Sequence, residues 1–451
     1  MMSLRQQTDK TDTLIAGMGV TGISCARFLQ RRNIPFRVID SRDEPPQLKI
    51  FRQEFAGSEI LTGGFDNGAL QGIRTLVLSP GIDLRHPFVE LARQQGIRVV
   101  GDIEIFADYS NAPVIGITGS NGKSTVTTLA GYLLERAGYK VRTGGNLGTA
   151  ALDLITEPAP DFYVLELSSF QLDLTQSLRP RAAVVLNVSD DHMDRYPDID
   201  AYTASKAQIY RQADWCIVNR DDVRVSAMPV GKSVLSFGTA APSRSDEFGL
   251  VEAGGKIWLA CGDLKLLPVD RLGIQGRHNW MNALATLALL QASGIALETV
   301  VEYLPEFTGL PHRCRLVAQR NGIRWINDSK ATNVGASAAA LESFDPPIIL
   351  IAGGDGKGAD FSVLRPSVTN RVKAVLLFGR DAALIEQALA DVAPCIRLNN
   401  MEEAVTRAAA MARPGDTVLL APACASLDMY TSYAARGDDF ARCVHKVLPH
   451  E

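Results

Sequence analysis

The sequence lacks the cysteine patterns that disulfide frameworks and zinc ribbons require. Its 7 cysteines are scattered, odd in number and never form a C-x-x-C pair. No apolar run is long enough to cross a bilayer, and the polar stretch 1–10 has no signal-peptide core. Because 46 Lys and Arg nearly balance 50 Asp and Glu, no basic field exists for nucleic acid or anionic lipid. We therefore expect a reduced, cytoplasmic protein with neither a nucleic-acid nor a membrane partner.

The most informative stretch is G-I-T-G-S-N-G-K-S-T at 116–125. A short apolar run at 113–115 precedes it, and apolar residues at helical spacing follow it as far as Gly138. The pattern predicts a buried strand, a glycine-rich turn and a helix. With 451 residues, 46% apolar and 21% charged, the chain has room for roughly three domains with cores of their own.

A turn of this kind indicates phosphate binding. Its backbone N–H groups surround phosphate oxygens, and the helix N-terminus adds a partial positive charge. Lys123 reaches the outer phosphates, and the Ser124 hydroxyl can bind Mg²⁺. Ile117 stands where the strict motif has its first glycine, so a surface loop that carries G-K-S by chance is the alternative. The flanking strand, helix and extra glycines favour the phosphate-binding loop.

Two further residues follow buried strands, where ligands of α/β sheets lie. Glu166 ends the apolar strand 161–165 and is placed like the metal-binding acid of phosphate-loop enzymes. A helix-capping carboxylate is the alternative. His192 follows the strand 182–188 among acidic residues, which favours a ligand over a packed or surface histidine. Asn279, near the start of a later helix, fits either a cap or a nucleotide contact.

The N-terminal segment carries a second glycine turn. The strand 13–16 leads into a literal G-x-G-x-x-G at 17–22, and the strand 36–39 ends at Asp40, an acid that commonly binds a ribose hydroxyl. The turn fits NAD, another nucleotide, or glycines that only allow close packing. No constellation for hydride transfer is evident.

The remaining segments predict further α/β structure. Strands at 348–352, 374–379 and 416–420 each end in a polar or glycine-rich loop, which indicates one functional edge. Residues 223–270 alternate weakly, and we expect a small β structure over the main sheet. Cys424 has no nearby histidine partner in sequence, so a packed residue is favoured over a nucleophile.

Six motifs together resemble those of the Mur ligases, ATP-dependent amide-forming enzymes of peptidoglycan precursor synthesis. They are T-G-S-N-G-K-S-T at 118–125, L-E-L-S-S-F-Q at 165–171, N-V-S-D-D-H-M-D-R-Y at 187–196, L-P-H-R at 310–313, N-D-S-K-A-T-N at 327–333 and G-G-D-G-K at 353–357. With S-P-G-I at 79–82 and C-A-S-L-D at 424–428, the resemblance covers nearly the whole chain in order.

The resemblance implies three α/β domains. The first, 1–102, is Rossmann-like and binds a UDP sugar, so that its glycine turn serves UDP and not NAD. The second, 103–309, is a central phosphate-loop (P-loop) mononucleotide-binding ATPase-like domain, and the third, 310–451, is Rossmann-like and binds the amino acid. The implied substrates are ATP, D-glutamate and UDP-N-acetylmuramoyl-L-alanine, joined through an acyl phosphate, with Mg²⁺ as cofactor. We expect a monomer.

The resemblance also assigns roles to individual residues, motif by motif. By periodicity alone, Lys206 is an ordinary helix lysine. The resemblance, however, matches it to a lysine that is carbamylated in this family. Carbamylation requires a neutral amine and hence a lowered pKa. The implied catalytic and metal-binding residues are Lys123, Glu166, His192 and Lys206, with Ser124 as a further metal ligand. The implied ATP contacts are Gly119, Ser120, Asn121, Gly122, Lys123, Ser124, Thr125, Asn279, Arg313 and Asp328.

The resemblance also implies contact residues for the two other ligands, the UDP sugar and D-glutamate. The implied UDP-sugar contacts are Gly19, Thr21, Ser41, Arg42, Ser79, Gly81, Asn146 and Ser168. The implied D-glutamate contacts are Thr332, Lys357, Ser426 and Tyr433. Position 41 is Ser where the family often has Thr, and position 433 is Tyr where Phe is common, which leaves fine contacts there open.

Three alternatives stay open at this point. The first is an NAD-dependent oxidoreductase built on the N-terminal glycine turn. The second is a related ligase that adds another amino acid or extends folate with glutamate. The third is a non-enzymatic nucleotide-binding regulator, against which Lys357 and Ser426 argue because such a protein needs no amino-acid pocket.

Overall fold

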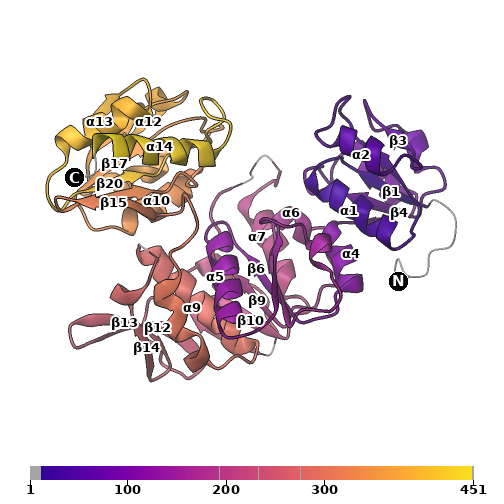
Figure 1. Ribbon diagram of the computed structural model, residues 1–451, viewed down its shortest axis with the longest axis horizontal. Coiled ribbons are helices and arrows are strands. Elements are labelled where there is room, and N and C mark those ends of the chain that lie inside the picture. Colours follow the sequence, from indigo (N-terminus) through magenta and orange to yellow (C-terminus); the bar gives the residue numbers. More distant parts are fainter. Residues whose placement is uncertain (1–11, 192, 194, 232, 275, 449–451) are drawn as a thin grey trace.

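The computed structural model describes residues 12–448, apart from 192, 194, 232 and 275. It contains a five-stranded, a nine-stranded and a six-stranded sheet. They follow one another along the chain, and Figure 1 shows the nine-stranded sheet between the other two. The expectation of a three-part α/β fold is therefore confirmed. No helix within the described ranges is long and apolar enough to span a membrane.

The first sheet is wholly parallel, with the strand order β3-β2-β1-β4-β5. Its order reverses beside β1, as in doubly wound folds that bind ligands at such a switch point. Its strands are β1 (Thr13–Ala16), β2 (Phe36–Ile39), β3 (Ile60–Leu61), β4 (Thr75–Leu78) and β5 (Arg98–Val100). Its helices are α1 (Val20–Arg31), α2 (Leu48–Glu54), α3 (Pro87–Gln94) and the 3₁₀ helix η2 (Asn67–Leu70).

The central sheet has the order β14-β13-β12-β11-β10-β9-β6-β8-β7. Side chains alternate between its two faces, so that Ile115 and Ile117 join the cluster under α5 and α9, whereas Val114 joins the opposite cluster with α4. Its strands are β6 (Val114–Thr118), β7 (Val141–Gly145), β8 (Phe162–Glu166), β9 (Ala182–Val185), β10 (Trp215–Asn219), β11 (Val234–Phe237), β12 (Glu247–Ala253), β13 (Lys256–Cys261) and β14 (Leu264–Pro268).

Helices of the central part cover both faces of that sheet. The α-helices are α4 (Asp102–Tyr109), α5 (Lys123–Arg136), α6 (Ser169–Leu172), α7 (Ile199–Ala207), α8 (Val223–Ser226) and α9 (Arg277–Ala292). The 3₁₀ helices are η3 (Ala151–Leu154), η4 (Gln208–Tyr210), η5 (Val269–Arg271), η6 (Leu297–Thr299) and η7 (Val301–Glu306).

The weakly alternating segment 223–270 does not lie over the sheet as expected. Strands β12, β13 and β14 instead extend the sheet at its edge: β12 pairs with β11 in parallel, and the two hairpin pairs are antiparallel. The exposed backbone groups of β11 gain partners in this way, which satisfies hydrogen bonds that an edge strand leaves open.

The third sheet has the order β15-β16-β20-β17-β18-β19, parallel except for the antiparallel pair β15–β16. Its strands are β15 (Arg315–Arg320), β16 (Ile323–Asn327), β17 (Ile348–Ala352), β18 (Val372–Leu377), β19 (Cys395–Arg397) and β20 (Thr417–Leu420). Its helices are α10 (Val334–Glu342), α11 (Arg365–Val368), α12 (Ala382–Leu389), α13 (Met401–Met411), α14 (Tyr433–Val447) and the 3₁₀ helix η8 (Phe361–Leu364).

An apolar contact joins the first sheet to the central one. Phe28 of α1 meets Tyr109 of α4 edge to face, with 5.0 Å between ring centroids. Phe106 of α4 meets Tyr163 of β8 in the same way, also at 5.0 Å. All four residues belong to one buried cluster, so helix α4 connects the two cores.

Candidate active site

The loop between β6 and α5 is held in shape by two glycines. Gly119 has φ +150° and Gly122 has φ +83°, and a side chain at Gly122 would place its Cβ 2.6 Å from Oδ1 of Asn282. Only glycine fits there without strain. Helix α5 then begins at Lys123 with its first N–H groups facing the loop, as the sequence predicts.

Two lysines converge on one carbonyl oxygen of this loop. The Nζ atoms of Lys123 and Lys206 each donate to the oxygen of Gly119 at 2.9 Å, and Lys123 also donates to Ser120 at 2.9 Å. Burial lowers the pKa of both amines, and the charge of Lys123 lowers that of Lys206 further. Because like charges meet where water is scarce, an anion bound here lowers their mutual repulsion.

Lys206 is buried to an extent that the sequence pattern does not reveal. Only 1% of its surface is exposed, although it lies in α7, a mostly polar helix. Its ammonium group lies 4.3 Å from the ring centroid of Tyr202. The pKa of Lys206 is held well below its usual value, chiefly by burial. This meets the requirement for a neutral amine that carbamylation imposes.

The two carboxylate oxygens of Glu166 differ in their contacts. Its side chain is buried, and Oε1 accepts a hydrogen bond from Nδ2 of Asn146 at 2.7 Å. Oε2 is buried and has no hydrogen-bond partner among the residues that the structure describes. An orphan carboxylate oxygen of this kind fits a hard cation such as Mg²⁺. The capping alternative does not apply, because the residue that caps α6 is Ser168.

Gly145, directly before Asn146, allows the turn after β7 to lie close to the backbone of Glu166. Gly145 has φ +101°, and a Cβ there would lie 2.4 Å from the carbonyl oxygen of Glu166. The backbone N–H of Asn146 donates to that same oxygen at 2.8 Å. The turn after β7 therefore lies against Glu166 through backbone contacts.

Two further residues, Ser124 and His192, are expected to bind the metal. Ser124 is buried at the start of α5, and its Oγ accepts a hydrogen bond from Arg313 at 2.7 Å. His192 lies outside the described residues. Among the residues that are described, no three His, Cys, Asp or Glu side chains cluster closely enough to hold a metal ion.

A cavity of about 440 Å³ opens beside the loop, between the central and the third sheet. Its size suits a nucleotide-like ligand. Six of the residues expected to contact ATP line it, namely Asn121, Gly122, Thr125, Asn279, Arg313 and Asp328. Gly119 and Ser120 belong to the loop beside it, and Lys123 and Ser124 begin helix α5 after that loop. Burial raises the pKa of Asp328 to about 6.

The expected UDP-sugar residues of the first sheet gather at the carboxyl ends of neighbouring strands. Gly19 and Thr21 follow β1, Ser41 and Arg42 follow β2, and Ser79 and Gly81 follow β4. Asn146 and Ser168 follow β7 and β8 of the central sheet.

Asp40, directly after β2, has hydrogen-bond partners in the glycine turn and in the segment that follows β2. Its carboxylate accepts a hydrogen bond from the N–H of Met18 at 2.6 Å and two from the Arg42 guanidinium at 2.8 Å. Although burial acts to raise its pKa, these bonds hold the pKa of Asp40 below its usual value. Asp40 therefore fixes the glycine turn to the segment after β2.

The expected D-glutamate residues also lie at strand ends. Thr332 follows β16, exposed Lys357 follows β17, buried Ser426 follows β20, and Tyr433 begins α14. These three strands are neighbours in the third sheet. Cys424 is fully buried, and burial raises the pKa of its thiol to about 12, so the packed interpretation agrees with the structure.

Comparison with known proteins places this geometry in a family. Residues 11–101, 117–290 and 312–424 match the models of the "Mur ligase MurD-like, N-terminal domain", the "Mur ligase middle domain" and the "Mur ligase, glutamate ligase domain". The UDP-N-acetylmuramoylalanine–D-glutamate ligase of Nitrosococcus oceani is 50% identical over 439 residues, which cover 97% of each chain.

The chain belongs to the Mur ligase family.

Other relatives agree with this assignment. The enzyme of the same name from Pseudomonas aeruginosa is 46% identical over 440 residues, 96% of this Mur ligase and 98% of the relative. A pseudomurein peptide ligase type C from Methanothermus fervidus has a similar structure, with a TM-score of 0.62 at 18% identity over 97% of this chain and 100% of that one. The MurF ligase of Thermotoga maritima in complex with ADP has a TM-score of 0.60 at 16% identity, over 99% and 97% of the two chains. These solved structures share the fold.

Two features of this Mur ligase were missed in the sequence. Lys330 lines the cavity, and burial lowers the pKa of its amine. Arg436 is 1% exposed in α14 and donates to the carbonyl oxygens of Ser329, Gly353 and Cys424, which joins three loops at the edge of the third sheet. A cation in a short polar motif gives no sign of burial, so no sequence signal separates these residues from solvated ones.

Proposed function

We propose that this Mur ligase joins D-glutamate to UDP-N-acetylmuramoyl-L-alanine and splits ATP to ADP and phosphate. The relatives that carry this activity in their names match nearly the full chain. The observation that supports it most directly is the pair of lysine amines on the Gly119 carbonyl beside Glu166, next to a cavity of about 440 Å³.

In the proposed reaction, a carboxylate oxygen of the alanine forms a bond to the γ-phosphorus of ATP while the bond to ADP breaks. The amine of D-glutamate then attacks the carbonyl carbon, phosphate leaves, and the amine loses a proton. Catalysis of this kind depends mainly on alignment and on charge neutralisation. Lys123 neutralises charge on the transferring group, and Arg313 carries a further cation from the third domain to the same loop.

Mg²⁺ fits the free oxygen of Glu166. We propose Ser124, Glu166, His192 and carbamylated Lys206 as the residues that hold it. A carbamate converts the Lys206 cation into an anionic oxygen ligand, which the crowded positive charge around Gly119 favours. When bound, Mg²⁺ neutralises negative charge on the phosphates.

The remaining assignments complete the proposal. Domains 1–102, 103–309 and 310–451 bind the UDP sugar, ATP and D-glutamate respectively, through the residues named above for each ligand. We further propose that the protein is cytoplasmic and monomeric, and light scattering of the purified protein tests the monomeric state.

Phosphate release tests the proposed function. The full chain is supplied with ATP, Mg²⁺ and UDP-N-acetylmuramoyl-L-alanine, and then with a panel of D- and L-amino acids. We expect only D-glutamate to give sustained release together with an amide product. Release that depends on a different amino acid would instead identify a related ligase, and no release with any of them would contradict ligase activity.

A further inference from the structure

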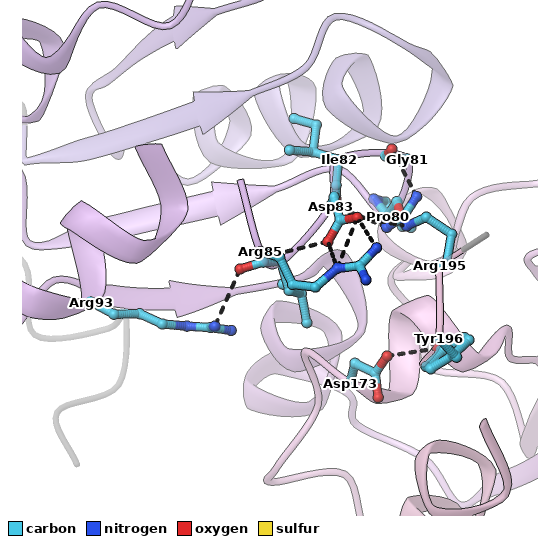
Figure 2. A network of polar contacts seen from close by, with 10 residues as sticks. Pro80, Gly81, Ile82, Asp83, Arg85, Arg93, Asp173, Arg195 and Tyr196 are labelled. Atoms are coloured by element: carbon cyan, nitrogen blue, oxygen red, sulfur yellow. Dashed lines mark hydrogen bonds and ion pairs between the residues drawn. The ribbon is translucent and has the colours of Figure 1, made fainter. Parts of the chain in front are cut away.

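Arg195 reaches from the central part of the fold to the first sheet. It lies in the segment between β9 and α7, and its guanidinium donates to the loop that follows β4 (Figure 2). Nη1 donates to the carbonyl oxygen of Gly81 at 3.1 Å, and Nη2 donates to those of Ile82 at 3.1 Å and Pro80 at 3.4 Å. Nε also lies 3.7 Å from a carboxylate oxygen of Asp83.

These contacts are partly shielded from solvent and well matched to arginine. The side chain of Arg195 is 18% exposed, and its guanidinium lies 4.4 Å from the ring centroid of Phe170. A planar group with several N–H donors can serve three carbonyls and stack on a ring at once, which an ammonium cannot do. Asp83 stays ionised beside it, because hydrogen bonds from Arg85 lower the pKa of that carboxyl to about 2.

On its other side, Arg195 is connected to buried Lys206 of α7, which donates to the phosphate loop. The rings of Phe170 and Tyr196 are stacked with centroids 5.8 Å apart. The Tyr196 hydroxyl donates to Asp173 at 2.7 Å (Figure 2) and lies 3.2 Å from Oγ of Ser205. Ser205 directly precedes Lys206 in α7, so packed groups run continuously from the loop after β4 to the Gly119 carbonyl.

Arg195 adds a polar contact between the first sheet and the central one, away from their apolar contacts. The rings of Phe28 and Tyr109 hold α1 against α4, and Leu174, which follows α6, packs in the buried cluster of the first sheet. Arg195 contacts the first sheet at another place, on the edge where β4 ends. Contacts at separated places restrain rocking of the first sheet on the central one.

We propose that Arg195 is a positioning residue that sets the loop 79–82, and with it the acceptor substrate, relative to the phosphate loop. The proposal rests on the proposed function, in which Ser79 and Gly81 contact the UDP sugar. Phosphoryl transfer requires the acceptor carboxylate in line with the leaving group, and a misplacement of about 1 Å costs on the order of 100-fold in rate. In the proposed function the uridine end contacts Thr21, Ser41 and Arg42 of the first domain, so the affinity for UDP does not depend on how that domain is oriented on the central one.

Arg195→Met tests the proposal, because methionine keeps an unbranched side chain but has no N–H donor. We expect kcat to fall about 10- to 100-fold, with the Kd for UDP and the KM for ATP within about twofold of wild type. Arg195→Lys should recover only part of the lost kcat. Arg93→Gln is the matched control, since Arg93 donates to the carbonyl of Leu84 in the same loop, but from α3 of the same domain (Figure 2). It should keep the wild-type kcat.

Circular dichroism and thermal unfolding establish which variants are folded. A folded Arg195→Met variant with the wild-type kcat would overturn the proposal. So would a Lys variant with full activity, or an equal loss of kcat in Arg93→Gln. A wild-type protein that releases no phosphate with D-glutamate contradicts the proposed function and the inference together, whereas failure of the inference alone leaves the wild type active.

Discussion

Lys206 and Lys123 both direct an ammonium group at the carbonyl oxygen of Gly119, where water has little access. An amine that is buried and faces a second cation favours its neutral form, and a neutral amine can add CO₂. The resulting carbamate is an anion and a possible metal ligand. The carbamate hypothesis and an ordinary structural lysine differ in what they predict for substitutions.

Three rates of phosphate release distinguish the carbamate hypothesis from an ordinary structural lysine. Lys206→Ala should lose most phosphate release, on the order of 100-fold, because the metal site loses an anionic ligand. Acetate should restore part of the rate by entering the vacated space. Lys206→Arg should stay inactive, because a guanidinium forms no carbamate and remains cationic.

The controls are Lys140→Ala, which removes an exposed lysine of the same domain, and chloride at the ionic strength of the acetate. Lys140→Ala should retain the wild-type rate. An active Arg variant together with no effect of acetate would mean that Lys206 acts as a packed cation.

Some of these residues could be predicted from the sequence, whereas the surroundings of Lys206 and Arg195 could not. Lys123, Ser124 and Glu166 follow from local patterns, because a glycine turn and the end of a buried strand specify their surroundings. The burial of Lys206 arises from packing of α7 against the loop after β6, and nothing within α7 encodes it. Arg195 stands in a quoted motif, yet its partners lie more than 100 residues away in the chain.

At the scale of elements, helix α4 carries an unusual group at its start. Asp102 is 3% exposed, and its carboxylate accepts hydrogen bonds from Nε2 of Gln171 at 3.0 and 3.3 Å. Burial raises the pKa of Asp102 to about 6. The folded state therefore holds this proton more tightly than the unfolded state, where an aspartate titrates near 3.9.

This shift fixes the sign of a pH effect. The contribution of Asp102 to the free energy of unfolding falls as pH rises from about 4 to 6, and is constant above that. Asp102→Asn should remove this pH-dependent loss of stability. The free energy of unfolding of the variant should therefore exceed that of the wild type by an amount that grows from pH 4 to 6, to no more than about 3 kcal/mol. Thermal unfolding at pH 4, 5, 6 and 8 measures it. Exposed Asp263→Asn is the control, and a gain that does not change with pH would contradict the prediction.

Element positions could be predicted where local signals are strong. The strands at β6, β17 and β20 stand where apolar runs end in glycine or polar loops. The placement of β12, β13 and β14 could not be predicted, because it depends on which edge accepts them. Pairing of β11 with β12 is a contact between segments, and their weak alternation fits a position over a sheet as well as one beside it.

At the scale of the whole molecule, the N-terminal glycine turn distinguishes a ligase from an oxidoreductase. We expect UDP to raise the thermal unfolding temperature and NAD to leave it unchanged. Ligand at about 100 times its Kd adds about 2.7 kcal/mol to the stability of the state that binds it. Arg42→Ala removes a proposed uridine contact and should reduce the shift. Saturable stabilisation by NAD at micromolar levels, with none by UDP, would contradict the assignment.

The sequence motifs specify three α/β units, but not how these are set against one another. That arrangement depends on a few side chains at the boundaries. Arg313 reaches Ser124 across 189 positions of the chain, and Arg195 reaches Gly81 across 114. Such pairs have no periodic signature, so the shape of the cavity could only be obtained from the fold.

Gly145 shows how this geometry limits the course of evolution. The position excludes a side chain for two separate reasons, its φ of +101° and the Glu166 carbonyl 2.4 Å from where a Cβ would lie. A single compensating change elsewhere can relieve only one of them. We therefore expect glycine to stay at position 145 in any population of variants selected for growth.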